Sequence, residues 1–449
     1  MLRRTFLASS ASVLPALAQS GAGPNILLIL ADDLGYGNLG CYGAKEIQTP
    51  QLDRMAAEGM RFTQAYAGST VCAPSRCCLM TGLHTGHAKI RGNGKRELAL
   101  GRADVTITEI LKRAGYRTGL FGKWSLGGLG TAGYPTRKGF DEWFGFFSQT
   151  HAHNYYPEHL LENDHEFLLR GNTGTKRNDY AHDVILERCL KFIERPSAEP
   201  FFCKLALTIP HANNELGRDH GNGMEVPDTA PYTARNWPAP DKNFAAMVTR
   251  MDAGIGRIFD LLRATGRHEN TLVVFTSDNG PHREGGHNPE FFDDNGPLRG
   301  IKRDLYEGGI RVPAIARWPG RVPAGAVSHA VWAQWDLLPT FAAAANQGSP
   351  AGIDGVNVLS EWSGKPAARP HPPLYWEFHE RGFQQAVRFE DWKAVRTKNG
   401  QAVELYDLQS DVGESRDVAG ARPEVVKRAE ALLESSRSDS LGWPVAAAR

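Results

Sequence analysis

The sequence predicts an α/β protein in which helices sandwich a large, mostly parallel sheet and a smaller C-terminal α+β domain carries an antiparallel sheet. Three observations lead to this prediction: short apolar runs recur along the chain, helix-like segments separate them, and the pattern changes after about residue 345. Apolar runs without polar alternation are typical of strands buried on both faces. Strands of this kind that alternate with helices form a parallel sheet between two helical layers.

The predicted strands and helices follow one another in regular order. Apolar runs predict strands over residues 25–30, 117–121, 201–208, 272–275 and 310–316. Apolar residues at helical spacing predict helices over residues 105–114, 178–194 and 242–264. An earlier helix begins at Pro50, because proline is well tolerated at the first helical position and Thr49 can cap it.

The chain changes character towards its C-terminal end. Gly-Ser-Pro at 348–350 and the prolines of 366–373 interrupt it, as is typical of loops. Short strands are expected beyond them, over 385–388, 392–396 and 403–408, and a closing helix begins at Arg422-Pro423-Glu424. We therefore expect a catalytic domain over residues 22–345 and a C-terminal α+β subdomain over residues 346–449.

The first 18 residues differ from the rest. Paired arginines at positions 3 and 4 precede an apolar stretch over 7–17, which ends in the small-residue signature Ala-Leu-Ala. The arginine pair followed by Thr-Phe-Leu is similar to a bacterial twin-arginine export signal, and the alternative is an ordinary secretory signal with a basic start. We expect a periplasmic or extracellular protein. No other stretch approaches the ~20 apolar residues that span a bilayer, so no stable membrane anchor is expected.

The composition of the chain argues against some classes of partner and against some roles for the cysteines. The formal net charge of +1 over 449 residues excludes a broad basic surface for nucleic acid, so any anion must be recognised locally. The six cysteines show neither zinc-site spacing nor a dense disulfide framework. We expect most of them to be buried as small apolar residues, and Cys189 with Cys203 is the simplest pair in an oxidising compartment.

Polar residues follow four of the predicted strands where each strand ends. These residues are Asp32-Asp33, the segment 122–125 (Gly-Lys-Trp-Ser), Pro210-His211 and the segment 277–280 (Ser-Asp-Asn-Gly). Ligands bind at the carboxyl ends of strands in open α/β sheets. Any one of these residues alone could be an ordinary cap or turn residue. Four strand ends that agree favour a single functional site.

The polar residues form two chemical groups. The hard oxygen donors that suit calcium or magnesium better than zinc are Asp32, Asp33, Asp278 and Asn279. The cationic or protonatable residues are Arg76, Lys123, His211 and Lys302. Together they predict a metal-anchored pocket for an anionic group such as sulfate or phosphate.

Cys72 begins the segment Cys-Ala-Pro-Ser-Arg at 72–76. Pro74 and the helix-forming residues after it place Cys72 at a helix N-terminus, where backbone N–H groups favour negative charge. The residues alone predict a thiolate of low pKa, as in a cysteine hydrolase or a redox sensor. They do not distinguish that thiolate from an oxidised cysteine.

The segment 72–76 resembles the signature of the type I sulfatases, which belong to the alkaline phosphatase superfamily and carry formylglycine. Further segments match the family in order over nearly the whole chain after the export signal: 25–35, 81–82, 122–124, 277–280, 299–302, 307–313 and 404–408. The resemblance implies an alkaline phosphatase-like fold and a sulfuric ester hydrolase.

The resemblance also implies a mechanism. A sulfatase-maturating enzyme would oxidise Cys72 to formylglycine (3-oxoalanine), and one hydroxyl of its hydrate would attack sulfur. Removal of the proton from the other hydroxyl would then expel sulfate and restore the aldehyde. One calcium ion would be held by residue 72 with Asp32, Asp33, Asp278 and Asn279, and Asp278 would also act as the base for attack. Lys123 and Lys302 would bind the sulfate oxygens. His211 and Lys302 would assist departure of the alcohol, and Arg76 would hold the diol in place.

One position departs from the family pattern. The family usually has histidine after Gly-Lys-Trp, and this chain has Ser125. That histidine helps to regenerate the aldehyde, and proton transfer of this kind contributes about 10²–10⁴ in rate. His151 and His153 are the available substitutes, or else substrate contacts or packed polar residues. His379, from the C-terminal part, is a further candidate for substrate binding.

The predicted function is hydrolysis of sulfate esters, either of sulfated carbohydrates or of aryl sulfates. One alternative is a phosphonate or phosphate diester hydrolase on the same scaffold, because the metal and the nucleophile suit either anion. Another is a catalytically impaired, sulfatase-like binding protein that has lost turnover through Ser125. The export signal argues against a cytosolic cysteine hydrolase.

Overall fold

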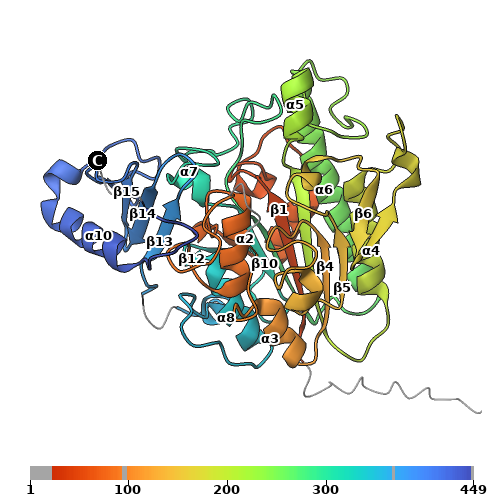
Figure 1. The fold of residues 1–449 in the computed structure, drawn as a ribbon, viewed down its shortest axis with the longest axis horizontal. Coiled ribbons are helices and arrows are strands. Elements are labelled where there is room, and N and C mark those ends of the chain that lie inside the picture. Colours follow the sequence, from red (N-terminus) through yellow and green to blue (C-terminus); the bar gives the residue numbers. More distant parts are fainter. Residues whose placement is uncertain (1–22, 94–98, 367–369, 446–449) are drawn as a thin grey trace, which may run out of the picture.

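The computed structural model of the chain describes residues 23–93, 99–366 and 370–445. The predicted export signal, residues 1–18, lies outside the described residues. Figure 1 shows a large central sheet with helices packed against it and a smaller sheet beside it that carries the C-terminal helix. The predicted fold class is confirmed.

The large sheet contains ten strands. Its five central strands run parallel to one another, and the strands that flank this group, β10 and β6, run antiparallel to their neighbours. In spatial order the strands are β11 (Ala326–Ser328), β2 (Met60–Phe62), β10 (Ala314–Arg317), β9 (Thr271–Ser277), β1 (Asn25–Asp32), β8 (Phe201–Pro210), β4 (Arg117–Gly122), β5 (Glu142–Gly145), β6 (His159–Glu162) and β7 (His165–Leu168).

The central strands form because their apolar side chains are buried on both faces. In β1, Leu28 and Leu30 pack into one layer of the core, and Leu27 and Ile29 pack into the layer on the opposite face. All residues of β8 and β9 are buried. Burial of one such side chain stabilises the fold by about 1.5–3 kcal/mol, so this sheet is a rigid base for the residues that follow its strands.

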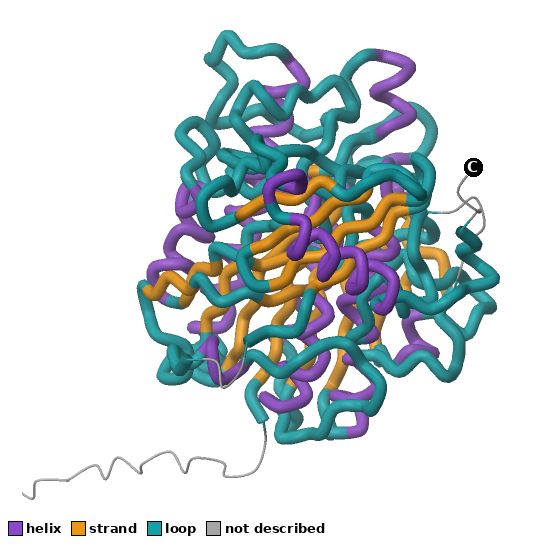
Figure 2. Tube along the Cα trace, turned by 90° about the vertical axis from the view of Figure 1, so that its left-hand side faces the viewer, coloured by secondary structure: helices purple, strands orange, loops and turns teal. Residues whose placement is uncertain are grey.

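Helices cover both faces of the large sheet (Figures 1 and 2). One face packs against α2 (Cys72–Thr81), α3 (Ile107–Arg113) and α8 (Leu337–Ala344). The other packs against α1 (Pro50–Glu58), α4 (Ala181–Glu194) and α6 (Ala239–Ala264). The four helices predicted from apolar spacing and from Pro50 are all present. The remaining short elements are β3 (Ala65–Tyr66), which pairs with β12 (Trp332–Ala333), α5 (Asn214–His220), α7 (Glu307–Ile310) and α9 (Leu359–Trp362).

The strand predicted over 310–316 is partly wrong. The helical turn α7 includes Ile310, and β10 begins only at Ala314, after Pro313. Proline has no N–H to donate to a neighbouring strand, which explains why pairing starts behind it. Strand β10 runs antiparallel to β9, so the group of parallel strands ends at β9 on this side of the sheet.

The C-terminal part contains an antiparallel sheet of four strands, β13 (Leu374–Phe378), β14 (Gln384–Phe389), β15 (Trp392–Arg396) and β16 (Glu404–Asp407). The last three were predicted. The first was missed because it directly follows a proline-rich segment. Helix α10 (Pro423–Ser435) lies beside this sheet (Figure 1), and its Val425, Ala429 and Leu433 pack into one apolar cluster with residues of the sheet.

A buried carboxylate connects the C-terminal sheet to the main body of the protein. Glu307, on α7, accepts hydrogen bonds from the Tyr66 hydroxyl at 2.7 Å, from Lys393 Nζ at 3.0 Å and from the Arg311 guanidinium at 3.2 Å. Lys393 lies on β15 and Tyr66 on β3. Glu307 therefore has a structural role that ties the C-terminal sheet to the main body.

Replacing Glu307 with alanine should lower the free energy of unfolding by about 3–5 kcal/mol, because buried Arg311 loses its carboxylate partner and buried Lys393 keeps only Glu414. Burial raises the pKa of Glu307, but Lys393 and Arg311 outweigh it and bring the pKa to about 2. The wild-type carboxylate therefore stabilises the fold fully above its ordinary pKa of about 4.3 and loses this contribution as pH falls towards 2. Urea unfolding at pH 7 and pH 3 measures both effects, with Glu307→Gln as the control that keeps the size of the side chain and one acceptor oxygen but removes the charge. An alanine variant as stable as wild type at pH 7 would contradict the assignment.

All six cysteines are free thiols in the structure, and five of them are buried. The Sγ atoms of Cys189 and Cys203 lie 3.5 Å apart, well beyond the S–S bond length of about 2.05 Å. Cys189 and Cys203, the pair expected from the sequence, are thus neighbours in space but form no disulfide bond. Among the described helices, none combines the length and the apolar character that crossing a membrane requires.

Candidate active site

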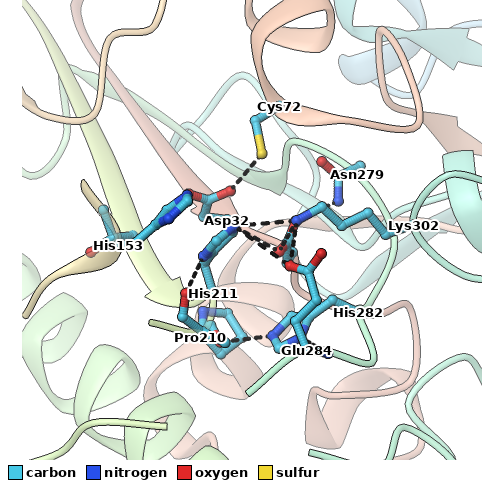
Figure 3. Close-up of polar contacts among 12 residues, drawn as sticks. Asp32, Cys72, His153, Pro210, His211, Asn279, His282, Glu284 and Lys302 are labelled. Atoms are coloured by element: carbon cyan, nitrogen blue, oxygen red, sulfur yellow. Dashed lines mark hydrogen bonds and ion pairs between the residues drawn. The ribbon is translucent and has the colours of Figure 1, made fainter. Parts of the chain in front are cut away.

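The carboxyl ends of four parallel strands bring the predicted residues to one edge of the large sheet. Asp32 ends β1 and lies beside Pro210, the last residue of β8. Lys123 directly follows β4, and Asp278 directly follows β9. Figure 3 shows side chains from these strand ends gathered around Asp32 and Cys72.

Cys72 is the first residue of α2, as predicted, and it is buried. Its Sγ lies 3.3 Å from Asp32 Oδ1 and donates a hydrogen bond to it (Figure 3). Burial, and then the charge of Asp32, raise the pKa of the Cys72 thiol well above its ordinary value. The prediction of a low-pKa thiolate is therefore wrong, because the helix N-terminus does not offset burial beside a carboxylate. As an unmodified thiol, Cys72 is a weak nucleophile at neutral pH.

Arg76 lies one helical turn after Cys72 and is fully buried. Its Nε and Nη2 atoms lie 2.9 Å and 2.7 Å from Asp278 Oδ2, and Nη1 donates to the Lys123 carbonyl at 2.8 Å. Lys123 Nζ in turn lies 2.6 Å from Asp32 Oδ2. Arg76 and Lys123 thus hold the carboxylates of Asp278 and Asp32 in place.

Asp33, Asn279 and Lys302 form the other half of the cluster. Asp33 has a φ of 64°, a left-handed conformation that aspartate adopts more readily than most residues. Its Oδ1 accepts from Asn279 Nδ2 at 2.7 Å, and its Oδ2 accepts from Lys302 Nζ at 2.7 Å. All nine residues predicted for catalysis or metal binding therefore lie in one connected cluster.

The oxygen donors fit a hard cation. Asn279 Oδ1 is buried and has no hydrogen-bond partner among the described residues, although the amide nitrogen of the same side chain is bonded. An unpartnered buried acceptor beside the carboxylates of Asp32, Asp33 and Asp278 is the arrangement that a calcium ion satisfies, because calcium takes six to eight oxygen ligands. The carboxylates of Asp32 and Asp33 also lie within 4.8 Å of Cys72 Sγ and a His211 nitrogen.

His211 is a neutral imidazole next to Lys302. Its Nδ1 donates to the Ala212 carbonyl at 2.7 Å, so Nε2 presents its lone pair to Lys302 Nζ at 3.2 Å. Burial, and then the charge of Lys302, lower the pKa of His211 to about 3. Lys302 is the protonated member of this pair.

Two neighbouring residues were missed from the sequence. Glu284 Oε2 lies 3.1 Å from Lys302 Nζ, and His282 Nε2 lies 3.1 Å from the Pro210 carbonyl (Figure 3). Both closely follow the Ser-Asp-Asn-Gly segment at 277–280, and this position was the signal that could have identified them.

The structure separates the candidates for substrate binding. The His153 ring stacks on that of His211, with ring centroids 4.9 Å apart, whereas His151 stacks on His159. His379 Nε2 lies 3.0 Å from Glu377 Oε1, and the His379 ring contacts Phe383 and Trp443 instead of the cluster. Of these three histidines, His153 alone joins the cluster.

Ser125 lines a cleft beside Cys72. It has a φ of 68°, and its hydroxyl donates to Gln149 Oε1 at 2.5 Å. The cleft is lined by aromatic, small and amide side chains and contains no charged side chain among its described lining residues: Ala73, Ile90, Gly92, Asn93, Trp124, Ser125, Gly127, Gly128, Trp143, Phe146, Phe147, Ser148 and Gln149. Asn93 Oδ1 accepts from the backbone N–H of Ala73, which connects the cleft to the start of α2.

Comparisons with known proteins agree with this site. Residues 24–347 match the family described as Sulfatase, and residues 300–438 match the C-terminal part of N-sulphoglucosamine sulphohydrolase. The N-acetylgalactosamine-6-sulfatase of Sus scrofa is 36% identical over 362 residues, which cover 75% of this chain and 65% of that protein. The N-acetylgalactosamine-6-O-sulfatase of Bacteroides thetaiotaomicron is 28% identical over 499 residues and 94% of each chain.

A solved structure shows the same architecture. Ps i-CgsB, crystallised with k-i-k-neocarrahexaose, superimposes with a TM-score of 0.81 at 29% identity, over 92% of each chain. The predicted family resemblance is confirmed over the residues that carry the site. The chain belongs to the sulfatase family.

Proposed function

We propose that the protein hydrolyses sulfate esters with a formylglycine formed from Cys72 and one calcium ion. The observation that carries this proposal is the position of Cys72 at the start of α2, 3.3 Å from a carboxylate and enclosed by paired acidic and basic side chains. The raised pKa of its thiol argues against direct use of the sulfur, which is consistent with prior oxidation. Once oxidised and hydrated, position 72 would supply a hydroxyl nucleophile.

Calcium would be held by residue 72 together with Asp32, Asp33, Asp278 and Asn279. When bound, the ion would polarise the sulfate oxygens and favour attack on sulfur. Asp278 is positioned by Arg76 and would accept the proton of the attacking hydroxyl. Arg76 would also hold that hydroxyl group in place.

Lys123 and Lys302 would bind the sulfate oxygens, because each ammonium group already pairs with a carboxylate at the edge of the cluster. Lys302 would also supply the proton that the departing alcohol needs. His211 accepts a hydrogen bond from Lys302 and would hold this ammonium towards the leaving oxygen. These roles follow from which groups carry protons at neutral pH.

The cleft beside Cys72 favours an uncharged leaving group. Its aromatic walls would pack against a sugar ring or an aryl ring, and Asn93, Ser125 and Gln149 would offer hydrogen bonds. Phe147, which is 49% exposed, provides an open apolar surface at this cleft. Relatives named for N-acetylgalactosamine sulfate and for a carrageenan-type oligosaccharide support a sulfated carbohydrate.

Several further features belong to this proposal. A maturating enzyme would act on residues 72–76 before export to the periplasm or the outside of the cell. Residues 22–345 would form the catalytic domain, and residues 346–449 would form the C-terminal α+β subdomain.

The proposal is tested by comparing turnover of an aryl sulfate, an aryl phosphodiester and an aryl phosphonate by protein co-expressed with a maturating enzyme. We expect kcat/KM on the sulfate to be higher by at least about 10²-fold, the contribution of one well-placed catalytic interaction. Faster turnover of the diester would instead identify a phosphodiesterase. Binding of sulfated sugars without turnover of any substrate would identify a binding protein.

A further inference from the structure

The proposed reaction needs a base that restores the aldehyde, and position 125 does not provide one. Ser125 carries a neutral hydroxyl, which donates its hydrogen to Gln149 Oε1. A serine hydroxyl is a very weak base at neutral pH unless another group activates it. The proton acceptor therefore has to come from another part of the chain.

His153 lies at the right place. It ends the short 3₁₀ helix formed by His151–His153, and its ring is nearly parallel to that of His211, with an interplanar angle of 17° and centroids 4.9 Å apart. A His211 ring nitrogen lies within 4.8 Å of Cys72 Sγ. Figure 3 shows the His153 and His211 rings side by side below Cys72, next to Asp32. The His153 ring is thus one ring layer from the groups around position 72.

A hydrogen bond fixes the tautomer of His153. Its Nδ1 lies 3.0 Å from Oε2 of Glu215, near the start of α5. Partial burial raises the pKa of Glu215, but the hydrogen bond from His153, a backbone hydrogen bond and the nearby positive charge of Arg218 together lower it below its ordinary value. An ionised carboxylate only accepts hydrogen bonds, so Nδ1 carries the hydrogen and Nε2 presents a lone pair. In the described part of the chain, Nε2 has no hydrogen-bond partner.

The surroundings keep His153 neutral. Burial, followed by the charge of Lys123, lowers its pKa, and Lys302 acts in the same direction, whereas Glu215 opposes the shift. The side chain is 13% exposed, which leaves a route for a proton to reach solvent. A neutral imidazole with a free lone pair and an exit route has the properties of a general base.

His151 does not meet these conditions. Its Nδ1 accepts a hydrogen bond from the Phe147 backbone N–H at 3.0 Å, and its ring packs between Phe146 and His159. These contacts hold His151 within its own loop. Of the two histidines that the sequence offered as substitutes, the geometry selects His153.

We propose that His153, oriented by Glu215, is the base that restores the aldehyde at position 72 in place of the histidine missing at position 125. This inference rests on the proposed sulfatase function. Nε2 takes the proton from the free hydroxyl on the carbon that also carries the transferred sulfate group. The O–H electron pair forms the C=O bond as the bond from carbon to the sulfate oxygen breaks, and sulfate leaves with that electron pair. The imidazolium then gives its proton to water.

The test compares matured wild type with His153→Ala, His153→Gln and His151→Ala, and records alcohol release, sulfate release and the intact mass of the protein. We expect both His153 variants to release about one equivalent of alcohol and then sulfate about 10²–10⁴-fold more slowly. Their intact mass should show accumulation of protein that carries one sulfo group. His151→Ala should show no such accumulation.

A rescue variant separates loss of the base from loss of structure. Histidine tolerates the left-handed backbone of position 125, which lies in the same cleft as Ala73. The double variant Ser125→His/His153→Ala should therefore release sulfate at least about 10-fold faster than His153→Ala, since one proton-transfer group is restored. Two variants test Glu215, which positions His153. Glu215→Ala should accumulate sulfo-protein. Glu215→Gln should not, because its amide oxygen still accepts the hydrogen bond from His153 Nδ1.

The outcomes distinguish this inference from the proposed function. Active wild type together with His153 variants that release sulfate at the wild-type rate, without sulfo-protein, would overturn the inference alone. Matured wild type that hydrolyses no sulfate ester would overturn the proposed function and the inference with it. Accumulation in the His153 variants and its reversal by histidine at position 125 would support both.

Discussion

Replacing Cys72 with alanine should abolish sulfate ester hydrolysis, with a fall in kcat/KM of more than about 10⁴-fold, because the variant has no side chain that can become the nucleophile. Removal of the central nucleophile leaves only binding and electrostatic effects, and these sustain a small residual rate. The fold should persist, since Cys72 sits at the start of α2 and its sulfur makes one hydrogen bond, to Asp32.

The matched control for this prediction is Cys77→Ala. Cys77 lies on the same helix and is equally buried, but it packs in the apolar core. We expect Cys77→Ala to keep most of the activity and to lose some stability, because a small cavity forms in the core. Aryl sulfate turnover and thermal unfolding of both variants make the comparison. Comparable activity in Cys72→Ala and wild type would refute the assignment of the nucleophile.

Removing calcium should lower activity by at least about 10²-fold, because metal stabilisation of the developing charge is worth several kcal/mol. The protein should also lose stability, since a ligand present at 100 times its Kd stabilises the folded state by about 2.7 kcal/mol. The physical reason is the cluster of Asp32, Asp33 and Asp278 with the unpartnered acceptor of Asn279. Calcium should restore both properties, whereas zinc, which prefers nitrogen and sulfur ligands, should not.

The experiment follows activity and melting temperature during chelation and re-addition of each metal. Asn279→Ala provides the test at one residue, because it removes the unpartnered oxygen without removing a charge, and it should weaken calcium binding in a calorimetric titration. Full activity in protein shown by elemental analysis to be metal-free would rule out a catalytic calcium ion.

The centre of the fold was predictable from the sequence, and its edges were not. The strands β1, β4, β8 and β9 have continuous apolar residues because both of their faces are buried, and this pattern is local. The short strands β6 and β7 lie at one end of the sheet, and β7 contains exposed residues such as His165 and Glu166, so its sequence does not differ from that of a loop. Their pairing depends on contacts with distant residues.

The strand-end residues of the site were predictable for the same local reason. Asp32, Lys123, His211 and Asp278 each follow a strand that could be identified. Glu284 was missed although it closely follows the Ser-Asp-Asn-Gly segment at 277–280. Glu215 was missed because it lies on the short helix α5, and no local pattern predicts that this helix approaches His153.

The pKa of Cys72 was wrongly predicted because the sequence shows the effect that lowers it but not the effects that raise it. The helix N-terminus is visible in the local sequence. Burial, and the approach of Asp32 from β1, are properties of the folded chain. The choice between His151 and His153 likewise depended on the fold, since the two residues are two positions apart and face different neighbours.

The central claim is that position 72 carries an aldehyde when the protein is active. Mass analysis of the peptide that contains residues 72–76, taken from the same matured preparation that hydrolyses an aryl sulfate, tests it most directly. The account predicts formylglycine in place of cysteine, in a fraction that rises in proportion to the specific activity. An unmodified thiol at position 72 in a preparation with full sulfatase activity would contradict it.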